Sequence, residues 1–167
     1  MPPLPAPLAQ SDFSMSGRVL VRQAERADVL RLYWSHRGES DDVRLETPLG
    51  QTLAELSMGQ GFARARLGDG REFEAADDSA LASQVIGTAL PLRRFAGWLQ
   101  AEPGGAASQI ERDAAGRVLT MSDAGWRLSY AGHGDVVSLD GPSLIEAKRE
   151  DVLVRIKIET WVRGGVE

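Results

Sequence analysis

Hydrophobic and polar residues alternate along much of the first half of the chain, as they do in strands with one buried face. Val19 and Val21 share a face of one such strand, and Leu30, Leu32 and Trp34 share a face of the next. In this half, strands are expected at residues 13–22, 29–34, 43–47, 52–56, 62–67 and 71–75. Their order and the short segments between them predict an antiparallel meander.

The segment Thr47-Pro48-Leu49-Gly50 separates two of these strands and has the composition of a type I turn. Proline occupies its second position and glycine its fourth, which are the preferences of that turn. A leucine at a turn apex is exposed unless it folds back onto the sheet. Leu49 is therefore either a packed side chain or a protruding apolar one.

Helical spacing replaces the alternation near the middle of the chain. Asp77 or Asp78 is a suitable N-cap for a helix over Ser79–Ile86, which Gly87 ends. A second helix is expected after Pro91, with apolar residues at helical spacing up to the Pro-Gly-Gly segment at 103–105. Strands then resume at residues 109–112, 117–121, 126–130, 144–148 and 152–161.

These elements predict an α+β fold built on one antiparallel sheet of about 11 strands. A sheet of this size tends to curl into an open, incomplete β-barrel, and two amphipathic helices are too few to form a separate layer. The helices are expected to form a short lid over an apolar cavity. Four prolines within residues 1–10 predict a flexible N-terminal arm, which leaves residues 11–163 as one domain.

Composition excludes several classes of function. The chain has 167 residues, a net charge of −5, 43% hydrophobic residues and no cysteine. An acidic chain with scattered arginines is unsuited to nucleic acid, and the lack of cysteine excludes thiol chemistry and cysteine-zinc sites. No apolar run approaches the roughly 20 residues that span a bilayer as a helix.

Candidate catalytic residues are few. His36 and His133 both lie in Gly- and Asp-rich segments that are expected to be solvated turns, the first within the polar stretch 35–42. The acidic pairs of the sequence are expected to cap helices or to make hydrogen bonds within turns. These pairs are Asp41-Asp42, Asp77-Asp78 and Glu150-Asp151. Arg93 and Arg94 are expected to form a solvated face of the second helix. We therefore expect no enzyme, no catalytic residue, no cofactor and no metal site.

Several segments, taken in order, resemble the LolB family of outer-membrane lipoprotein receptors. The resemblance extends from about Ser11 to Val162, and the ordered set is more specific than any single motif. The segments are Leu32-Tyr33-Trp34, Thr47-Pro48-Leu49-Gly50, Gly70 to Asp78, Leu90-Pro91-Leu92 with Trp98-Leu99, Gly125-Trp126 through Tyr130, and Ile158-Glu159-Thr160-Trp161.

The resemblance implies an open barrel with a helical lid, in agreement with the pattern of the residues. It also implies a monomeric receptor that takes acylated lipoproteins from the periplasmic carrier LolA and inserts them into the inner leaflet of the outer membrane. The implied partners are a LolA-like carrier, acylated lipoproteins and outer-membrane phospholipid. Such proteins lie on the periplasmic face of the outer membrane, lipid-anchored if an N-terminal cysteine has been removed from this chain and otherwise periplasmic.

The family resemblance assigns one site, and the alternation along the strands gives the candidates for a second. A leucine that protrudes between two early strands serves membrane insertion in the family, and it maps to Leu49 within Pro48-Leu49-Gly50. Trp161 lies on the opposite strand face from Val154 and Ile156, and is the tryptophan least expected in a cavity. The inward residues expected to line the acyl-chain cavity are Val19, Val21, Leu30, Leu32, Trp34, Leu45, Leu56, Ile86, Phe95, Trp98, Val154 and Ile156.

Two alternatives remain at this stage. A soluble LolA-like carrier would shuttle lipoproteins without inserting them, and an apolar-ligand-binding envelope module would bind a ligand without exchanging it with LolA. Membrane association that depends on Leu49 separates the first alternative from a receptor. Exchange with LolA separates the second.

Overall fold

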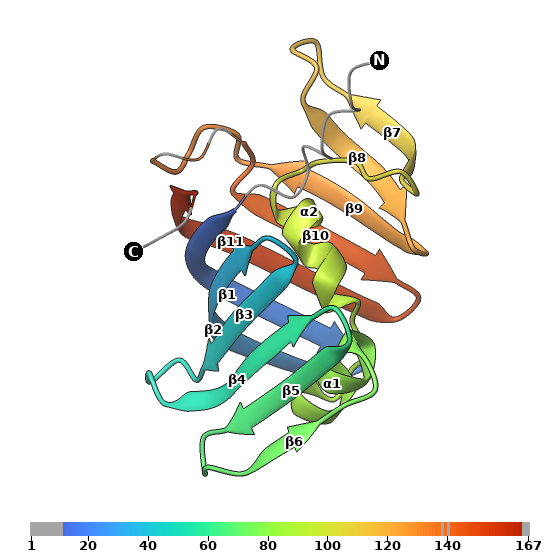
Figure 1. Ribbon diagram of the computed structural model, residues 1–167. Coiled ribbons are helices and arrows are strands. Elements are labelled where there is room, and N and C mark those ends of the chain that lie inside the picture. The colour runs from blue at the N-terminus through green and yellow to red at the C-terminus, as the bar shows by residue number, and fades with distance from the viewer. Residues whose placement is uncertain (1–11, 138, 140, 165–167) are drawn as a thin grey trace, which may run out of the picture.

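A computed structural model describes residues 12–137, 139 and 141–164, and within them the chain forms one sheet with two short helices (Figure 1). The predicted N-terminal arm, residues 1–10, lies outside the described residues. The strands are β1 (Phe13–Gln23), β2 (Arg26–Arg37), β3 (Ser40–Glu46), β4 (Thr52–Gly59), β5 (Phe62–Leu67), β6 (Glu72–Glu74), β7 (Ser108–Arg112), β8 (Val118–Asp123), β9 (Trp126–Ala131), β10 (Leu144–Arg149) and β11 (Val152–Arg163).

The sheet is antiparallel throughout and has the order β6-β5-β4-β3-β2-β1-β11-β10-β9-β8-β7. Because β1 pairs with β11, the first and last strands lie side by side at the centre of the sheet. β6 and β7 form its two edges and do not pair with each other, so the barrel stays open. The predicted α+β fold with an open antiparallel sheet is confirmed.

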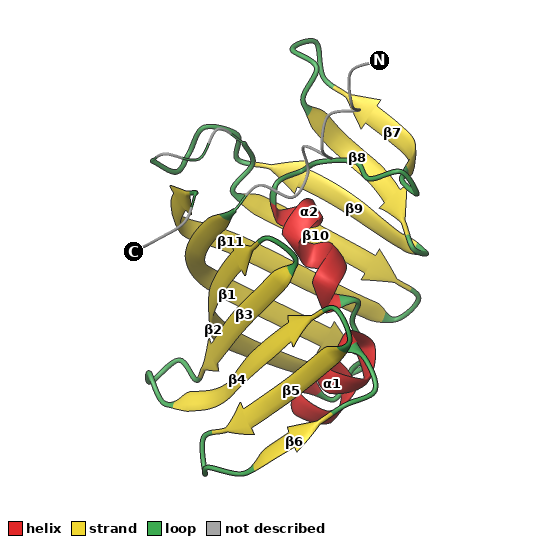
Figure 2. Ribbon diagram, viewed as in Figure 1, coloured by secondary structure: helices red, strands yellow, loops and turns green. Residues whose placement is uncertain are grey.

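The helices lie inside the curve of the sheet (Figure 2). Helix α1 (Asp78–Ile86) begins at Asp77, whose carboxylate accepts the backbone N–H of Ala80 at 2.8 Å, and ends at Gly87 with φ +93°, as predicted. The second helix is shorter than predicted. It consists of a 3-10 turn, η2 (Leu92–Arg94), and α2 (Phe95–Leu99), because tight i→i+3 hydrogen bonds close the chain there before Pro103.

The inner face of the sheet follows most of the predicted alternation, but a β-bulge between β1 and β11 interrupts it. Ser16 pairs with Thr160 and Gly17 with Ile158, which leaves Glu159 as an extra residue in β11. The expectation that Trp161 faces away from the apolar side is therefore wrong, because the bulge reverses the alternation after Ile158. Trp161 is only 3% exposed and stacks on Phe13, with ring centroids 4.5 Å apart.

None of the helices in the described segments is long and apolar enough to cross a membrane. The buried apolar side chains of the described residues form one core between the sheet and the two helices. This core contains the candidate functional site.

Candidate functional site

An apolar cavity lies between the inner face of the sheet and the helices. Its wall comes from β1, β2, β3, β4 and β11, and its cover from α1, η2, α2 and Leu90. All of the lining side chains are apolar. They are Val19, Val21, Leu30, Leu32, Trp34, Val43, Leu45, Leu56, Ile86, Leu90, Leu92, Phe95, Val154 and Ile156.

Eleven of the twelve residues expected at a cavity line this one, and Trp98 does not. The Trp98 ring packs behind Phe95, with centroids 4.8 Å apart, and its indole N–H donates to Asp123 at 2.8 Å. A buried indole N–H requires an acceptor, and this bond holds the ring outside the cavity. Val43 shares the strand face of Leu45, so its place was readable from the alternation. Leu90 and Leu92 were not predicted to line the cavity, because they flank Pro91 in a segment without regular periodicity.

Side chains almost completely fill the cavity in this structure. Its volume of ≈ 20 Å³ is close to the space of a single water molecule, which occupies roughly 10–15 Å³ by the same measure. Phe95 fills much of the space by stacking parallel to Trp34, with ring centroids 5.8 Å apart. A ligand with a long hydrocarbon chain fits only after the helices move away from the sheet.

Arg93 fixes one side of this helical lid. Its backbone N–H donates to the Asp78 carboxylate at 2.9 Å, which ties η2 to the first turn of α1. Its guanidinium donates to the Glu39 carbonyl at 3.1 Å, which ties the lid to the β2–β3 turn. Arg93 is half-buried, so the expectation of a solvated face is wrong for this residue.

Asp123, the last residue of β8, fixes the other side of the lid. The carboxylate is 7% exposed, accepts from the Arg94 guanidinium at 3.0 Å and accepts from the indole of Trp98. Arg94 is exposed but paired, which corrects the expectation that it is simply solvated. Burial, and then the nearby charge of Asp123, raises the pKa of the Tyr130 hydroxyl, which therefore stays protonated. No local signal in the sequence marks Asp123.

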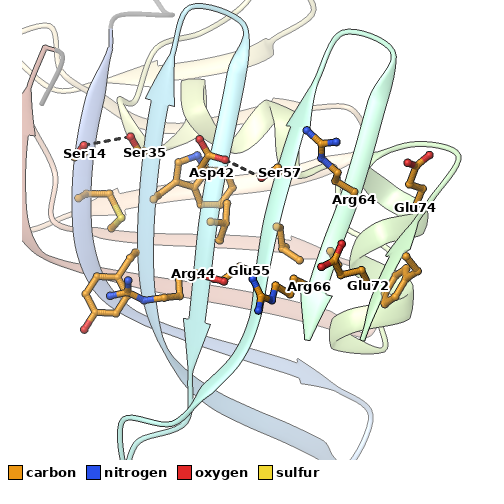
Figure 3. Close-up of a pocket in the computed structure, with 17 residues that line it drawn as sticks. Ser14, Ser35, Asp42, Arg44, Glu55, Ser57, Arg64, Arg66, Glu72 and Glu74 are labelled. Atoms are coloured by element: carbon orange, nitrogen blue, oxygen red, sulfur yellow. Dashed lines mark hydrogen bonds between the residues drawn. The ribbon is translucent and has the colours of Figure 1, made fainter. Parts of the chain in front are cut away.

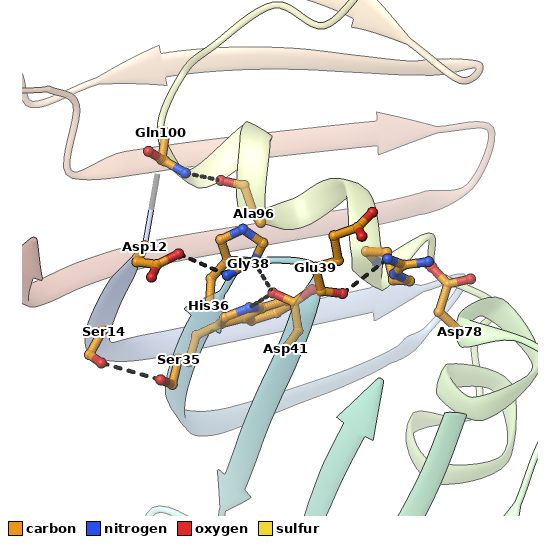
Figure 4. Close-up of polar contacts among 12 residues, drawn as sticks. Asp12, Ser14, Ser35, His36, Gly38, Glu39, Asp41, Asp78, Ala96 and Gln100 are labelled. Atoms are coloured by element: carbon orange, nitrogen blue, oxygen red, sulfur yellow. Dashed lines mark hydrogen bonds and ion pairs between the residues drawn. The ribbon is translucent and has the colours of Figure 1, made fainter. Parts of the chain in front are cut away.

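A buried polar cluster lies beside the lid (Figure 4). Asp41 Oδ1 accepts from the Trp34 indole at 2.9 Å and pairs with His36 Nδ1 at 2.8 Å. Because a carboxylate only accepts, Nδ1 of His36 carries the proton. His36 and Asp41 are each 2% exposed.

The expectation that His36 and Asp41 belong to a solvated turn is wrong. β2 and β3 extend through the polar stretch and meet at a turn of two residues, Gly38 and Glu39. The pairing places His36 directly opposite Asp41 on the inner face of the sheet. Asp42, predicted in the same turn, lies in β3 as well. His133 lies in a turn, Asp77 at the N-cap of α1, and Glu150 in the turn between β10 and β11, as expected.

Leu49 protrudes from the β3–β4 loop and is 91% exposed. The backbone N–H of Gly50 donates to the Thr47 carbonyl at 2.8 Å, and Thr47 N–H donates to the carbonyl of Gln51 at 2.8 Å. The Thr47 hydroxyl also accepts the Gln51 N–H at 3.2 Å. These bonds hold the loop in a defined turn, and Leu49 does not fold back onto the sheet.

A second hollow of ≈ 840 Å³ lies over β1 to β6 and is lined by charged and polar side chains together with apolar ones (Figure 3). Two rows of paired residues cross the strands there, and both alternate with the buried side chains of the opposite face. The rows are Ser14-Ser35-Asp42-Ser57-Arg64-Glu74 and Tyr33-Arg44-Glu55-Arg66-Glu72. The charged and polar side chains of these rows are unsuited to contact with a hydrocarbon chain.

Most of the sequence matches a known protein family. The family described as "Outer membrane lipoprotein LolB" matches residues 11–161. The chain belongs to the LolB family. The resemblance drawn from the ordered segments is thereby confirmed.

LolB proteins of other bacteria match most of the chain. The outer-membrane lipoprotein LolB of Dechloromonas aromatica (strain RCB) is 35% identical over 156 residues, covering 90% of this chain and 81% of that protein. LolB of Azoarcus sp. (strain BH72) is 32% identical over 151 residues, covering 90% of this chain and 78% of that protein. LolB is a lipoprotein-trafficking protein and not an enzyme, which confirms the prediction of a non-enzymatic protein.

Solved structures share the fold at much lower sequence identity. A LolA superfamily protein from Nitrosomonas europaea aligns with a TM-score of 0.58 and 10% identity, over 95% of this chain and 88% of that one. A DUF1329 family protein from Desulfovibrio piger aligns with a TM-score of 0.59 and 8% identity, over 96% and 88%. Membership of the LolB family, together with the LolA-superfamily fold, supports a role in lipoprotein sorting.

Proposed function

We propose that this chain receives acylated lipoproteins from a LolA-like carrier, holds their acyl chains in the apolar cavity and inserts them into the inner leaflet of the outer membrane. It works as a monomer on the periplasmic face of that membrane, within a domain of residues 11–163, and touches phospholipid through Pro48-Leu49-Gly50. The observation that carries the proposal is a cavity lined by apolar side chains under a helical lid.

Hydrophobic burial supplies the affinity. Each methylene that leaves water for an apolar site contributes about 0.8 kcal/mol, so a long acyl chain provides ample free energy to displace the lid. Phe95 and the other lid residues would separate from the wall as the chain enters. A lining without polar groups contributes no preference for a particular protein, which suits a receptor of many lipoproteins that share only their acyl chains.

Leu49 supports the insertion step. An apolar side chain that is 91% exposed at the tip of a fixed turn is unfavourable in water. Burying it in lipid contributes about 1.5–3 kcal/mol, enough for a transient contact but not for a stable anchor. A protruding leucine of this kind favours a receptor that inserts its cargo over a soluble carrier that only shuttles it.

Transfer of a radiolabelled lipoprotein from loaded LolA tests acceptance. The proposal predicts that the label co-purifies with this chain after mixing. Retention of the label on LolA would contradict it and would favour the envelope-module alternative. Acceptance without any association with liposomes would favour the soluble carrier.

The Asp123 contacts predict a specific change in lid opening. Asp123→Ala removes the acceptor of Arg94 and Trp98, and the closed lid loses about 1.4 kcal/mol, which corresponds to about tenfold faster uptake of a fluorescent fatty-acid methyl ester. Stopped-flow fluorescence measures this rate. Asp113→Ala is the matched control, because Asp113 pairs with Arg117 at 2.8 Å on a hairpin away from the lid. Equal rates in the two variants would show that Asp123 does not hold the lid.

A further inference from the structure

A small polar pocket lies at one end of the barrel. Its volume is ≈ 270 Å³, and it lies between the β1–β2 turn, the residues after α1 and the β10–β11 turn. The polar groups that line it include Gln23, Arg26 and Thr88, together with the carboxylates of Asp28 and Asp151. None of these residues belongs to the apolar cavity or to the Leu49 loop.

The pocket adjoins the apolar cavity. Val21 and Ile86 line both spaces, so these two side chains form the boundary between a polar pocket and an apolar one. From this boundary the apolar cavity continues along β2 through Leu30 and Leu32 to Trp34. The linings of the two spaces together are complementary to a molecule that has a hydrocarbon chain and one polar end.

We propose that this pocket binds the carbonyl end of an acyl chain, as an uncharged ester or amide, while the hydrocarbon tail lies in the apolar cavity with its methyl end toward Trp34. The inference rests on the proposed function and adds to it the direction in which the chain lies. The acyl chain then passes between Val21 of the sheet and Ile86 of the lid.

Two donors face the pocket. The Thr88 hydroxyl donates to Gln23 Oε1 at 2.9 Å, which orients the Gln23 amide and leaves its N–H groups for a ligand carbonyl. Thr88 is only 9% exposed, so the hydrogen bond between Thr88 and Gln23 is largely shielded from water. Arg26 donates through Nε to Asp28 at 3.0 Å, and within the described part of the chain its Nη groups make no hydrogen bond. A side chain at Gly87 would meet Arg26 Nη1 at 3.1 Å, so the guanidinium reaches over the end of α1.

The charges of the pocket favour an uncharged ligand. The pocket contains one positive side chain, Arg26, and two negative ones, Asp28 and Asp151. Asp28 already forms an ion pair with Arg26. The C-terminal end of α1, which carries partial negative charge, lies at the same place. A free carboxylate is repelled by this arrangement, whereas an ester or amide carbonyl accepts hydrogen bonds without adding charge.

Spin-labelled methyl stearate tests the direction of the chain by NMR. A nitroxide near the ester is expected to broaden the backbone amide signals of Gln23, Arg26 and Thr88. A nitroxide near the methyl end is expected to broaden the indole N–H signal of Trp34. The reverse pattern, or equal broadening by both probes, would overturn the inference while leaving acyl binding intact. If neither probe broadens any cavity signal, the proposed function fails together with the inference.

A matched pair of variants tests the role of Arg26. Arg26→Ala is expected to weaken binding of methyl palmitate about tenfold, the effect of a lost hydrogen bond to a charged donor, without changing binding of hexadecane. Arg22→Ala removes an exposed arginine of the same hairpin that does not line the pocket, and is expected to change neither affinity. Equal weakening of both ligands by Arg26→Ala, or no weakening of either, would overturn the role of Arg26 at the polar end.

Discussion

Replacing Leu49 with glutamate is expected to stop delivery of lipoproteins to liposomes while leaving their acceptance from LolA unchanged. The side chain is 91% exposed, so Leu49→Glu removes no packing from the core. It removes a membrane contact of about 1.5–3 kcal/mol and places a charge where lipid would lie, so delivery falls at least about tenfold. The measurement is the amount of radiolabelled lipoprotein that sediments with liposomes.

Leu53→Glu is the matched control for this experiment. Leu53 is a leucine on β4, just after the loop, and it is 36% exposed on the outer face of the sheet. The same added charge at this position is expected to leave delivery nearly unchanged. Loss of acceptance and delivery together in Leu49→Glu would refute the separation of the two tasks, and equal loss in both variants would reduce the effect to surface charge.

Asp41→Ala is expected to lower the free energy of unfolding by about 3–5 kcal/mol, because it removes the single acceptor of two buried hydrogen bonds. The carboxylate of Asp41 is buried and serves both His36 and the indole of Trp34, a residue of the cavity wall. Its removal leaves two buried donors without their acceptor. Urea denaturation followed by tryptophan fluorescence measures the change.

Asp42→Ala provides the comparison on the next residue of the same strand. Asp42 is exposed on the outer face, where its carboxylate accepts from the Ser57 hydroxyl at 2.8 Å. A loss of no more than about 1 kcal/mol is expected there, because water replaces an exposed hydrogen bond. Similar losses in both variants would contradict a structural role for the buried pair of Asp41 and His36.

The cavity wall was predictable because its cause is local. Alternation along β1, β2 and β11 assigns Val19, Leu32 and Ile156 to one face from sequence alone, since successive side chains of a strand point to opposite sides. The helix boundaries followed from Asp77 and Gly87 for the same reason. The family resemblance added the function that the residues by themselves left open.

The errors arose where a distant partner decides the outcome. One extra residue in β11 turned Trp161 inward, and the bulge depends on pairing with β1 rather than on the sequence around Trp161. Composition predicted a solvated turn around His36, but the register of β2 against β3 placed it opposite Asp41. Asp123 holds Trp98 out of the cavity across 25 residues of sequence, and neither residue alone signals the contact.

The most direct test of the account follows one labelled lipoprotein through a single reaction that contains loaded LolA, this chain and liposomes. We predict that the label leaves LolA, associates with this chain and then accumulates in the liposomes, and that no label reaches them when the chain is omitted. Label that reaches the liposomes equally well without the chain, or that remains on LolA in its presence, would contradict the proposal that this protein receives and inserts lipoproteins.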